Sequence, residues 1–183
     1  MKIFQIGFNK CGTKSLHYFF EQNGYNSFHW KDKKGRKLDD VLYNNHSKGI
    51  NLLETCEDFT FFCDSNFIQR HFELLEMSFP DAKFIFNIRP VKDWLVSRFN
   101  HAGGVTKNYY MKTYNTPENE IVKFWEVEWK LHEMRVRNYF QGQKKKKLLI
   151  YNIMIDNGQT ISNFLPNLSF TNLKFPHAHK SHR

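Results

Sequence analysis

The sequence predicts an α/β fold of three layers, α/β/α, in which helices cover both faces of a mostly parallel central sheet. Apolar runs of strand length alternate along the chain with segments of helical periodicity, as is typical of such folds. The run Lys83–Ile88 is largely apolar, like a strand buried on both faces of a parallel sheet. From 183 residues without an internal repeat, we expect one domain over 1–183, with variable loops at about 31–58 and 102–116 and an irregular basic tail at 170–183.

The first half of the chain supplies most of the predicted strands. The apolar run that begins at Lys2 ends in glycine, so we expect a strand that feeds a turn. Leu16, Phe19 and Phe20 then fall at helical spacing, and Gly24 ends that helix. On the same grounds, strands are expected at 2–8, 25–30, 59–63 and 83–88, and helices at 13–23, 38–47 and 66–79.

The second half is predicted to be mainly helical. Pro90 fits the first turn of a helix that runs to about residue 101, and the Gly-, Asn- and Tyr-rich segment 102–116 is expected to be a loop. A strand at 148–153 and a short helix near 158–165 lie toward the C-terminus. Between them and the loop we expect a long helix at 117–140, whose core residues are interpreted as Phe124, Trp125, Trp129 and Leu131.

The composition is that of a folded protein that attracts anions. Hydrophobic residues make up 40% of the chain and charged residues 25%, which excludes a disordered protein. Lys and Arg outnumber Asp and Glu by 27 to 18, for a formal charge of +9. This charge suits nucleic acid, an anionic membrane, an acidic substrate or a phosphorylated cofactor, and does not choose among them.

Cysteine usage and hydropathy indicate the compartment. Cys11, Cys56 and Cys63 are an odd number without metal-ligand spacing, which favours a reducing compartment and argues against a zinc site. No apolar run approaches the ~18–20 residues of a membrane span, and the N-terminus lacks the pattern of a signal peptide. We therefore expect a cytoplasmic protein without a membrane span, whose oligomeric state is not predicted.

The most informative segment is the turn Gly7–Ser15, between the first strand and the first helix. Glycines let the backbone N–H groups approach an anion, and the helix N-terminus adds its orphan donors. The turn is close to the G-x4-G-K-[ST] loop of nucleotide triphosphatases, but Thr13 stands where that loop has lysine. The strands that end near Asn87 and Asn152 also lack the carboxylate that such enzymes use to hold Mg²⁺, which disfavours a small-molecule kinase.

The order Lys10-x-Gly12-Thr13-x-Ser15 instead resembles the 5′-phosphosulfate loop of sulfotransferases, which use 3′-phosphoadenosine 5′-phosphosulfate (PAPS). Lys14 departs from that loop, where a hydroxyl residue is usual. A second resemblance is Arg89 at a strand end with Ser97 eight residues later, the pair that holds the 3′-phosphate of PAPS in this superfamily. A guanidinium fork and a hydroxyl suit a phosphate chemically.

A third segment is similar to the D-x-P-F … E-L … [FY]-P-[DN]-[AS]-K-F-I sequence of a compact sulfotransferase-like group. It comprises Asp64–Phe67, Phe72–Leu74 and Phe79–Ile85, with Asn66 in place of the proline. The resemblance covers 2–30 and 59–101, and more weakly 148–180, so it implies a P-loop-containing sulfotransferase-like fold.

The resemblance implies sulfuryl transfer from PAPS by in-line displacement, with 3′-phosphoadenosine 5′-phosphate (PAP) as product and no metal. The acceptor would be the hydroxyl or amine of a small molecule or glycan-like compound, with no nucleic-acid partner. Lys10 would act on the leaving phosphate as the catalytic lysine. The residues that would bind the donor are Lys10, Cys11, Gly12, Thr13, Lys14, Ser15, Arg89, Ser97 and, in a C-terminal F-P-H-x-N-like element, Lys180.

The acceptor also needs a general base, for which Asp64 is the first candidate, ahead of Glu54 and His101. Asp64 fits equally well as a helix N-cap, since Ser-Asn-Phe follows it.

Other interpretations stay open at this point. Arg89 would form a surface ion pair with Asp93 if the phosphate interpretation were wrong, and the basic loop Lys31–Lys37 is either solvated or a contact for an acidic ligand. The alternatives to a sulfotransferase are a P-loop kinase, a basic module that binds nucleic acid, and a degenerate relative without activity.

Overall fold

The structure is a computed structural model that describes residues 1–176. Residues 1–88 and 146–176 form one compact unit, the sheet unit, and Arg89–Lys145 form a second, the helical unit. The predicted Lys180 lies outside the described residues.

The sheet unit contains five parallel strands in the order β2-β3-β1-β4-β5. Its strands are β1 (Ile3–Gln5), β2 (Ser27–His29), β3 (Phe61–Cys63), β4 (Lys83–Ile88) and β5 (Leu148–Asn152). Its helices are α1 (Thr13–Glu21), α2 (Leu38–Ser47), α3 (Asn66–Arg70), α4 (Phe72–Ser78) and α8 (Gly158–Phe164). The prediction of a three-layer fold around a parallel sheet is confirmed.

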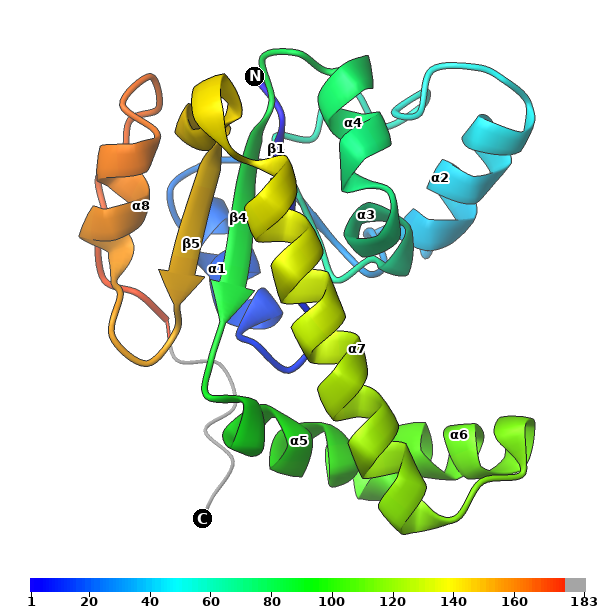
Figure 1. Ribbon diagram of the computed structural model, residues 1–183. Coiled ribbons are helices and arrows are strands. Elements are labelled where there is room, and N and C mark those ends of the chain that lie inside the picture. The colour runs from blue at the N-terminus through cyan, green and yellow to red at the C-terminus, as the bar shows by residue number, and fades with distance from the viewer. Residues whose placement is uncertain (177–183) are drawn as a thin grey trace. The chain divides into compact units, whose positions relative to one another are not determined.

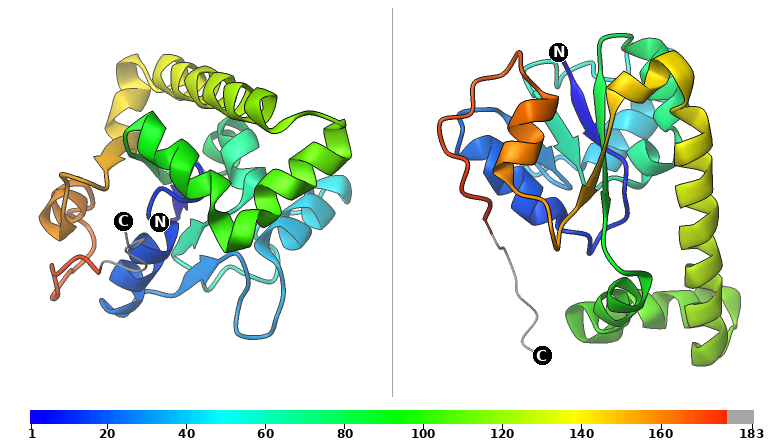
Figure 2. Two further views of the ribbon diagram at one scale, coloured as in Figure 1. Left: turned by 90° about the horizontal axis from the view of Figure 1, so that it is seen from below. Right: turned by 60° about the vertical axis from the view of Figure 1, so that its left-hand side comes forward.

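The two faces of the sheet differ because side chains alternate along each strand. On one face, Ile3, Phe61 and Ile85 form a fully buried cluster with residues of α1 and α8. On the other, the Phe4 ring lies 5.4 Å from Phe62, 5.7 Å from Phe84 and, at the end of α4, 5.8 Å from Phe79. Figures 1 and 2 show α1 and α8 on one side of the sheet and α3 and α4 on the other.

The helical unit is built around a buried arginine. It consists of α5 (Val91–Phe99), the 3-10 turn η1 (His101–Gly104), α6 (Val105–Tyr114) and α7 (Glu118–Tyr139). The Arg98 guanidinium lies 4.8 Å from the Trp125 ring and 5.1 Å from the Trp94 ring, and donates a 3.2 Å hydrogen bond to Tyr110 Oη. Stacked aromatic rings and a hydrogen bond allow this cation to be buried between α5, α6 and α7.

The predicted loop at 102–116 is wrong, because most of this segment forms the helix α6. Its Tyr, Thr and Asn residues have weak helix propensity, but contacts of Tyr110 with Arg98 and Trp125 stabilise the helix. Gly104 and Asn115, both left-handed, bound it. A further difference concerns a single position. The helix predicted at 66–79 breaks at His71, whose φ and ψ are −123° and 31°.

The core of α7 was also only partly predicted. Trp125 and Trp129 are buried, but Phe124 and Leu131 are 52% and 55% exposed. Spacing of three or four residues alone does not tell which of two apolar stripes on a helix faces the core. Within residues 1–176, no helix combines the length and apolar character needed to cross a membrane.

Candidate functional site

Three residues with unusual backbone conformation mark the carboxyl edge of the sheet. Lys10, Trp30 and Asp64 follow β1, β2 and β3, which are adjacent strands, and have φ values of 65°, 49° and 60°. Residues with side chains rarely adopt this left-handed conformation, and backbone strain of this kind clusters at functional sites. Ligands of open α/β sheets also bind at the carboxyl ends of the strands, so this edge is the candidate site.

The loop after β1 brings the backbone close to its neighbours. Gly12 is the N-cap of α1 with φ 78°, a conformation that suits glycine, and it offers no side chain to cap the helix. The first turn of α1 contains no acidic residue. At Gly7, a Cβ atom would collide with the carbonyl and the side chain of Asn87, so only glycine fits there.

Two buried amides, Gln5 and Asn87, hold this loop in place. Gln5 Nε2 donates to Gly7 O at 2.6 Å and to Asn87 Oδ1 at 2.5 Å, while Asn87 Nδ2 donates to Cys11 O at 2.7 Å. Gln5 Oε1 accepts from Asp64 N at 2.9 Å. We call these two side chains the amide clamp, because they join β4 to the segments that follow β1 and β3. Preorganisation of this kind fixes the geometry of a site before any ligand binds.

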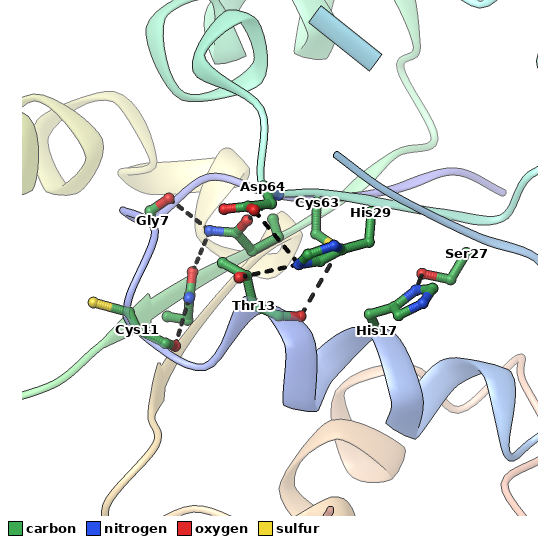
Figure 3. A network of polar contacts seen from close by, with 10 residues as sticks. Gly7, Cys11, Thr13, His17, Ser27, His29, Cys63 and Asp64 are labelled. Atoms are coloured by element: carbon green, nitrogen blue, oxygen red, sulfur yellow. Dashed lines mark hydrogen bonds and ion pairs between the residues drawn. The ribbon is translucent and has the colours of Figure 1, made fainter. Parts of the chain in front are cut away.

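Beside the loop, His29 contacts residues from two other segments. His29 Nε2 lies 3.4 Å from Thr13 Oγ1 and 3.5 Å from Asp64 Oδ2 (Figure 3). The His29 and Asp64 side chains are 18% and 25% exposed, so both are partly shielded while still accessible to a ligand. A histidine beside a carboxylate can take up a proton and have the resulting charge stabilised.

A second histidine supports the first from α1. The His17 ring lies 5.2 Å from the His29 ring, and His17 Nδ1 is 2.7 Å from Ser27 Oγ. Its Nε2 lies 3.2 Å from Glu21 Oε2. Burial lowers the pKa of His17, although Glu21 opposes this shift. These contacts hold His17 in place behind His29.

The charge state of His29 follows from its surroundings. Burial, with the positive charge of Lys14 adding to it, lowers the pKa of His29 from 6.5 to about 4. His29 is therefore neutral near pH 7 and is able to accept a proton.

We expect this low pKa to make the protein less stable in acid. Between pH 6.5 and 4 the unfolded chain takes up a proton at His29 that the folded protein does not, so the stability present above pH 6.5 is lost as the pH falls. At pH 4.5 this loss amounts to about 2–3 kcal/mol. Urea unfolding at pH 7 and 4.5 should show a smaller loss for His29→Gln than for wild type, while His46→Gln, an exposed change on α2, should follow wild type. Equal losses of stability for His29→Gln and wild type would contradict this expectation.

The structure separates Asp64 from the N-cap of the helix that follows it. Ser65 is the N-cap of α3, since its Oγ accepts from Ile68 N at 3.2 Å. Asp39, from α2, also accepts from Phe67 N at 3.1 Å. Asp64 itself lies one residue earlier, with its carboxylate toward His29. The capping alternative for Asp64 is therefore wrong, and its role as a base stays a prediction.

The other predicted residues lie in two places. Lys10, Cys11 and Gly12 belong to the loop after β1, and Thr13, Lys14 and Ser15 form the first turn of α1. Arg89 follows β4 directly and Ser97 lies on α5, both in the helical unit. The alternative ion pair between Arg89 and Asp93 does not form, and Asp93 has no ion pair within the described chain.

Sequence reasoning missed His29, Gln5 and Asn87. The sequence contained one indication of these residues: each is a polar residue inside or directly beside a buried apolar run. Buried polar side chains need partners, which makes such interruptions informative. Their partners, however, come from other segments of the chain. Among residues 1–176, no group of three or more His, Cys, Asp and Glu side chains is placed to hold a metal ion.

Comparison with known proteins adds one match. A family model described as sulfotransferase domain matches residues 2–148. The matched span includes the loop after β1, His29, Asp64, the amide clamp and the segment that follows β4. No curated protein matches the chain.

Proposed function

The chain belongs to the sulfotransferase domain family, and from this premise we propose that it transfers a sulfuryl group from PAPS to a hydroxyl or amine acceptor. The observation that carries the proposal is the contact of His29 with Asp64 and with Thr13, a residue of the predicted phosphosulfate loop. This contact supports a proton acceptor beside a site for an anionic donor. Sulfotransferases generally use PAPS as donor.

The loop after β1 fits the 5′ end of PAPS. The N-terminus of α1 provides backbone donors and the positive end of a helix dipole, with a glycine N-cap and no acidic residue in its first turn. Lys10 and Lys14 add positive charge at either side of Gly12. We assign the 5′ phosphosulfate to these residues together with Cys11, Thr13 and Ser15.

Lys10 is the residue to which we assign the main catalytic effect. When bound, PAPS supplies the activated sulfuryl group, whose bond to the phosphate oxygen breaks as the bond to the acceptor forms. Negative charge then grows on the leaving phosphate, and the Lys10 ammonium stabilises it. Such electrostatic stabilisation is usually the largest single contribution to catalysis in reactions of this kind.

On the acceptor side, we assign proton transfer to His29 and Asp64 together. Neutral His29 takes the proton of the acceptor hydroxyl or amine, and the Asp64 carboxylate, 3.5 Å from Nε2, stabilises the imidazolium that forms. This revises the assignment of Asp64 as sole base.

The 3′-phosphate provides the test of the donor. The resemblance assigns it to Arg89 and Ser97, so Arg89→Ala should weaken the binding of PAP by about 10- to 100-fold, the loss of a charge-assisted contact. Calorimetric titration without metal, with PAP, ADP and AMP as ligands, measures this. Arg137→Ala, which removes an exposed arginine of the same unit, is the matched control and should bind PAP like wild type.

Two results would overturn the donor assignment. One is binding of ADP as tight as that of PAP, since ADP lacks the 3′-phosphate. The other is binding of none of the three nucleotides, which would leave a relative without activity. Tighter binding of ATP in the presence of Mg²⁺ would support the kinase alternative instead.

A further inference from the structure

Trp30 differs from the other tryptophans of the protein. Trp94 and Trp125 are fully buried and Trp129 is 5% exposed, whereas Trp30 is 53% exposed. It directly follows His29, the residue to which we assign proton transfer. A large aromatic surface at the edge of a polar site is typical of the groups that hold a ring-shaped ligand.

The backbone holds Trp30 in a fixed and unusual conformation. Its φ is 49°, in the left-handed region shared with Lys10 and Asp64. Trp30 N donates to Cys63 O at 3.2 Å, and Trp30 O accepts from Leu38 N at 2.9 Å. The residue is thus tied to β3 on one side and to the start of α2 on the other. The Trp30 side chain is therefore exposed although its backbone is held in place. Its strained backbone lies at the same edge of the sheet as the strained backbones of Lys10 and Asp64.

The loop that follows Trp30 is fixed as well. Lys31 and Lys37 form an antiparallel bridge at its two ends. Between them, Asp32 accepts from Arg36 Nε at 2.7 Å and from the backbone N of Lys34 and Arg36 at 3.0 and 2.9 Å. Arg36 Nη1 also donates to Thr55 O at 2.9 Å. The loop is therefore preorganised.

This arrangement leaves a surplus of positive charge beside Trp30. Asp32 is the only acidic residue of the segment 31–37, and its carboxylate is engaged by Arg36. The exposed cations that remain are Lys31, Lys33, Lys34 and Lys37. Lys31 Nζ lies 4.7 Å from the centre of the Trp30 ring, so one of these charges is held at the aromatic surface.

We propose that Trp30 and the basic loop 31–37 bind the acceptor, and that the acceptor is a ring-shaped hydroxy compound that carries a negative charge. The ring packs on the exposed indole and the lysines attract the anionic group. His29 and Trp30 are consecutive in the chain, so the proposed acceptor surface begins one residue after the proposed base. The proposal rests on the proposed function and names its substrate class. Anionic phenols and anionic sugars share this chemistry.

Two pairs of probe compounds test the proposal. The two members of each pair share a ring and differ in one substituent, which is a carboxylate in the first and a neutral polar group in the second: 4-hydroxybenzoate with 4-hydroxybenzamide, and methyl β-D-glucuronide with methyl β-D-glucoside. In ¹⁵N-labelled protein the indole N–H signal of Trp30 is identified by its loss in Trp30→Phe. We expect the anionic member of at least one pair to shift this signal and to bind about three- to tenfold more tightly than its neutral partner, as for exposed charges. The pair that responds distinguishes a phenol from a sugar.

Variants separate the ring from the charge. Binding of the responding anion, followed by calorimetry, should be lost in Trp30→Ala and retained within a few fold in Trp30→Phe. The double change Lys33→Gln and Lys34→Gln should weaken binding of the anion and leave binding of its neutral partner unchanged. Tyr109→Ala, which removes a 62% exposed ring from α6, should bind like wild type. The proposal is wrong if neither anion shifts the Trp30 signal, if neutral partners bind as tightly, or if Trp30→Ala binds like wild type.

This inference and the proposed function fail in different ways. If PAP binds through its 3′-phosphate but no ring compound reaches Trp30, the acceptor assignment is wrong and the donor assignment stands. If an anionic ring binds at Trp30 but PAP does not bind, the acceptor surface stands and the donor assignment is wrong.

Discussion

Replacing Lys10 by methionine should reduce the kcat of sulfuryl transfer by about 100- to 1000-fold, the usual effect of removing one group that stabilises charge in the transition state. Methionine keeps the length of the side chain and must adopt the same left-handed backbone, with φ 65°. The change therefore removes the ammonium and leaves the conformational cost of the loop unchanged. Transfer of ³⁵S from labelled PAPS to the acceptor found with the ring probes measures the rate.

The control for Lys10→Met is Lys48→Met, at the end of α2, where an exposed lysine is lost. It should retain the wild-type rate. Binding of PAP separates catalysis from donor binding: we expect Lys10→Met to weaken it by much less than it lowers kcat, because the charge grows only in the transition state. Equal losses in binding and in kcat would mean that Lys10 only holds the donor. A rate close to that of wild type would exclude Lys10 as the catalytic lysine.

The second large effect is expected at the amide clamp, where Asn87→Leu should destabilise the protein by about 2–5 kcal/mol. Asn87 is fully buried and joins Gln5 to the carbonyl of Cys11. Leucine has a similar size but leaves one N–H of Gln5 and this carbonyl without their partner away from water. The cost follows from these unsatisfied groups, since little volume is lost.

Urea unfolding followed by circular dichroism measures this loss, and Asn44→Leu on the exposed side of α2 is the control. Surface changes of that kind usually stay within about 0.5 kcal/mol. Asn87→Leu should also weaken PAP binding at low temperature, where the variant is folded, because the loop loses its support. A stability change below about 1 kcal/mol would show that the clamp does not hold the loop.

The positions of the strands along the chain were predictable because they depend on local patterns. Residues 83–88 alternate little in polarity, which indicates a strand covered on both faces, and the structure confirms β4 with these bounds. The loop around Lys10, Gly12 and Thr13 was equally accessible, since its residues are neighbours in the chain and glycine at a strand–helix turn has a direct physical meaning. By contrast, α6 was missed because its stability comes from Arg98 and Trp125, which lie elsewhere in the sequence.

The sequence by itself therefore determined the fold class, the loop after the first strand and the resemblance to sulfotransferases. Only the tertiary structure decided which distant side chains meet. His29 pairs with Cys63 in the parallel register of β2 and β3, which brings Asp64 beside it, and Gln5 pairs with Ile85, which brings Asn87 to the same face two residues later. A parallel register is set by packing across the whole sheet and by long crossover connections, so no local pattern encodes these contacts.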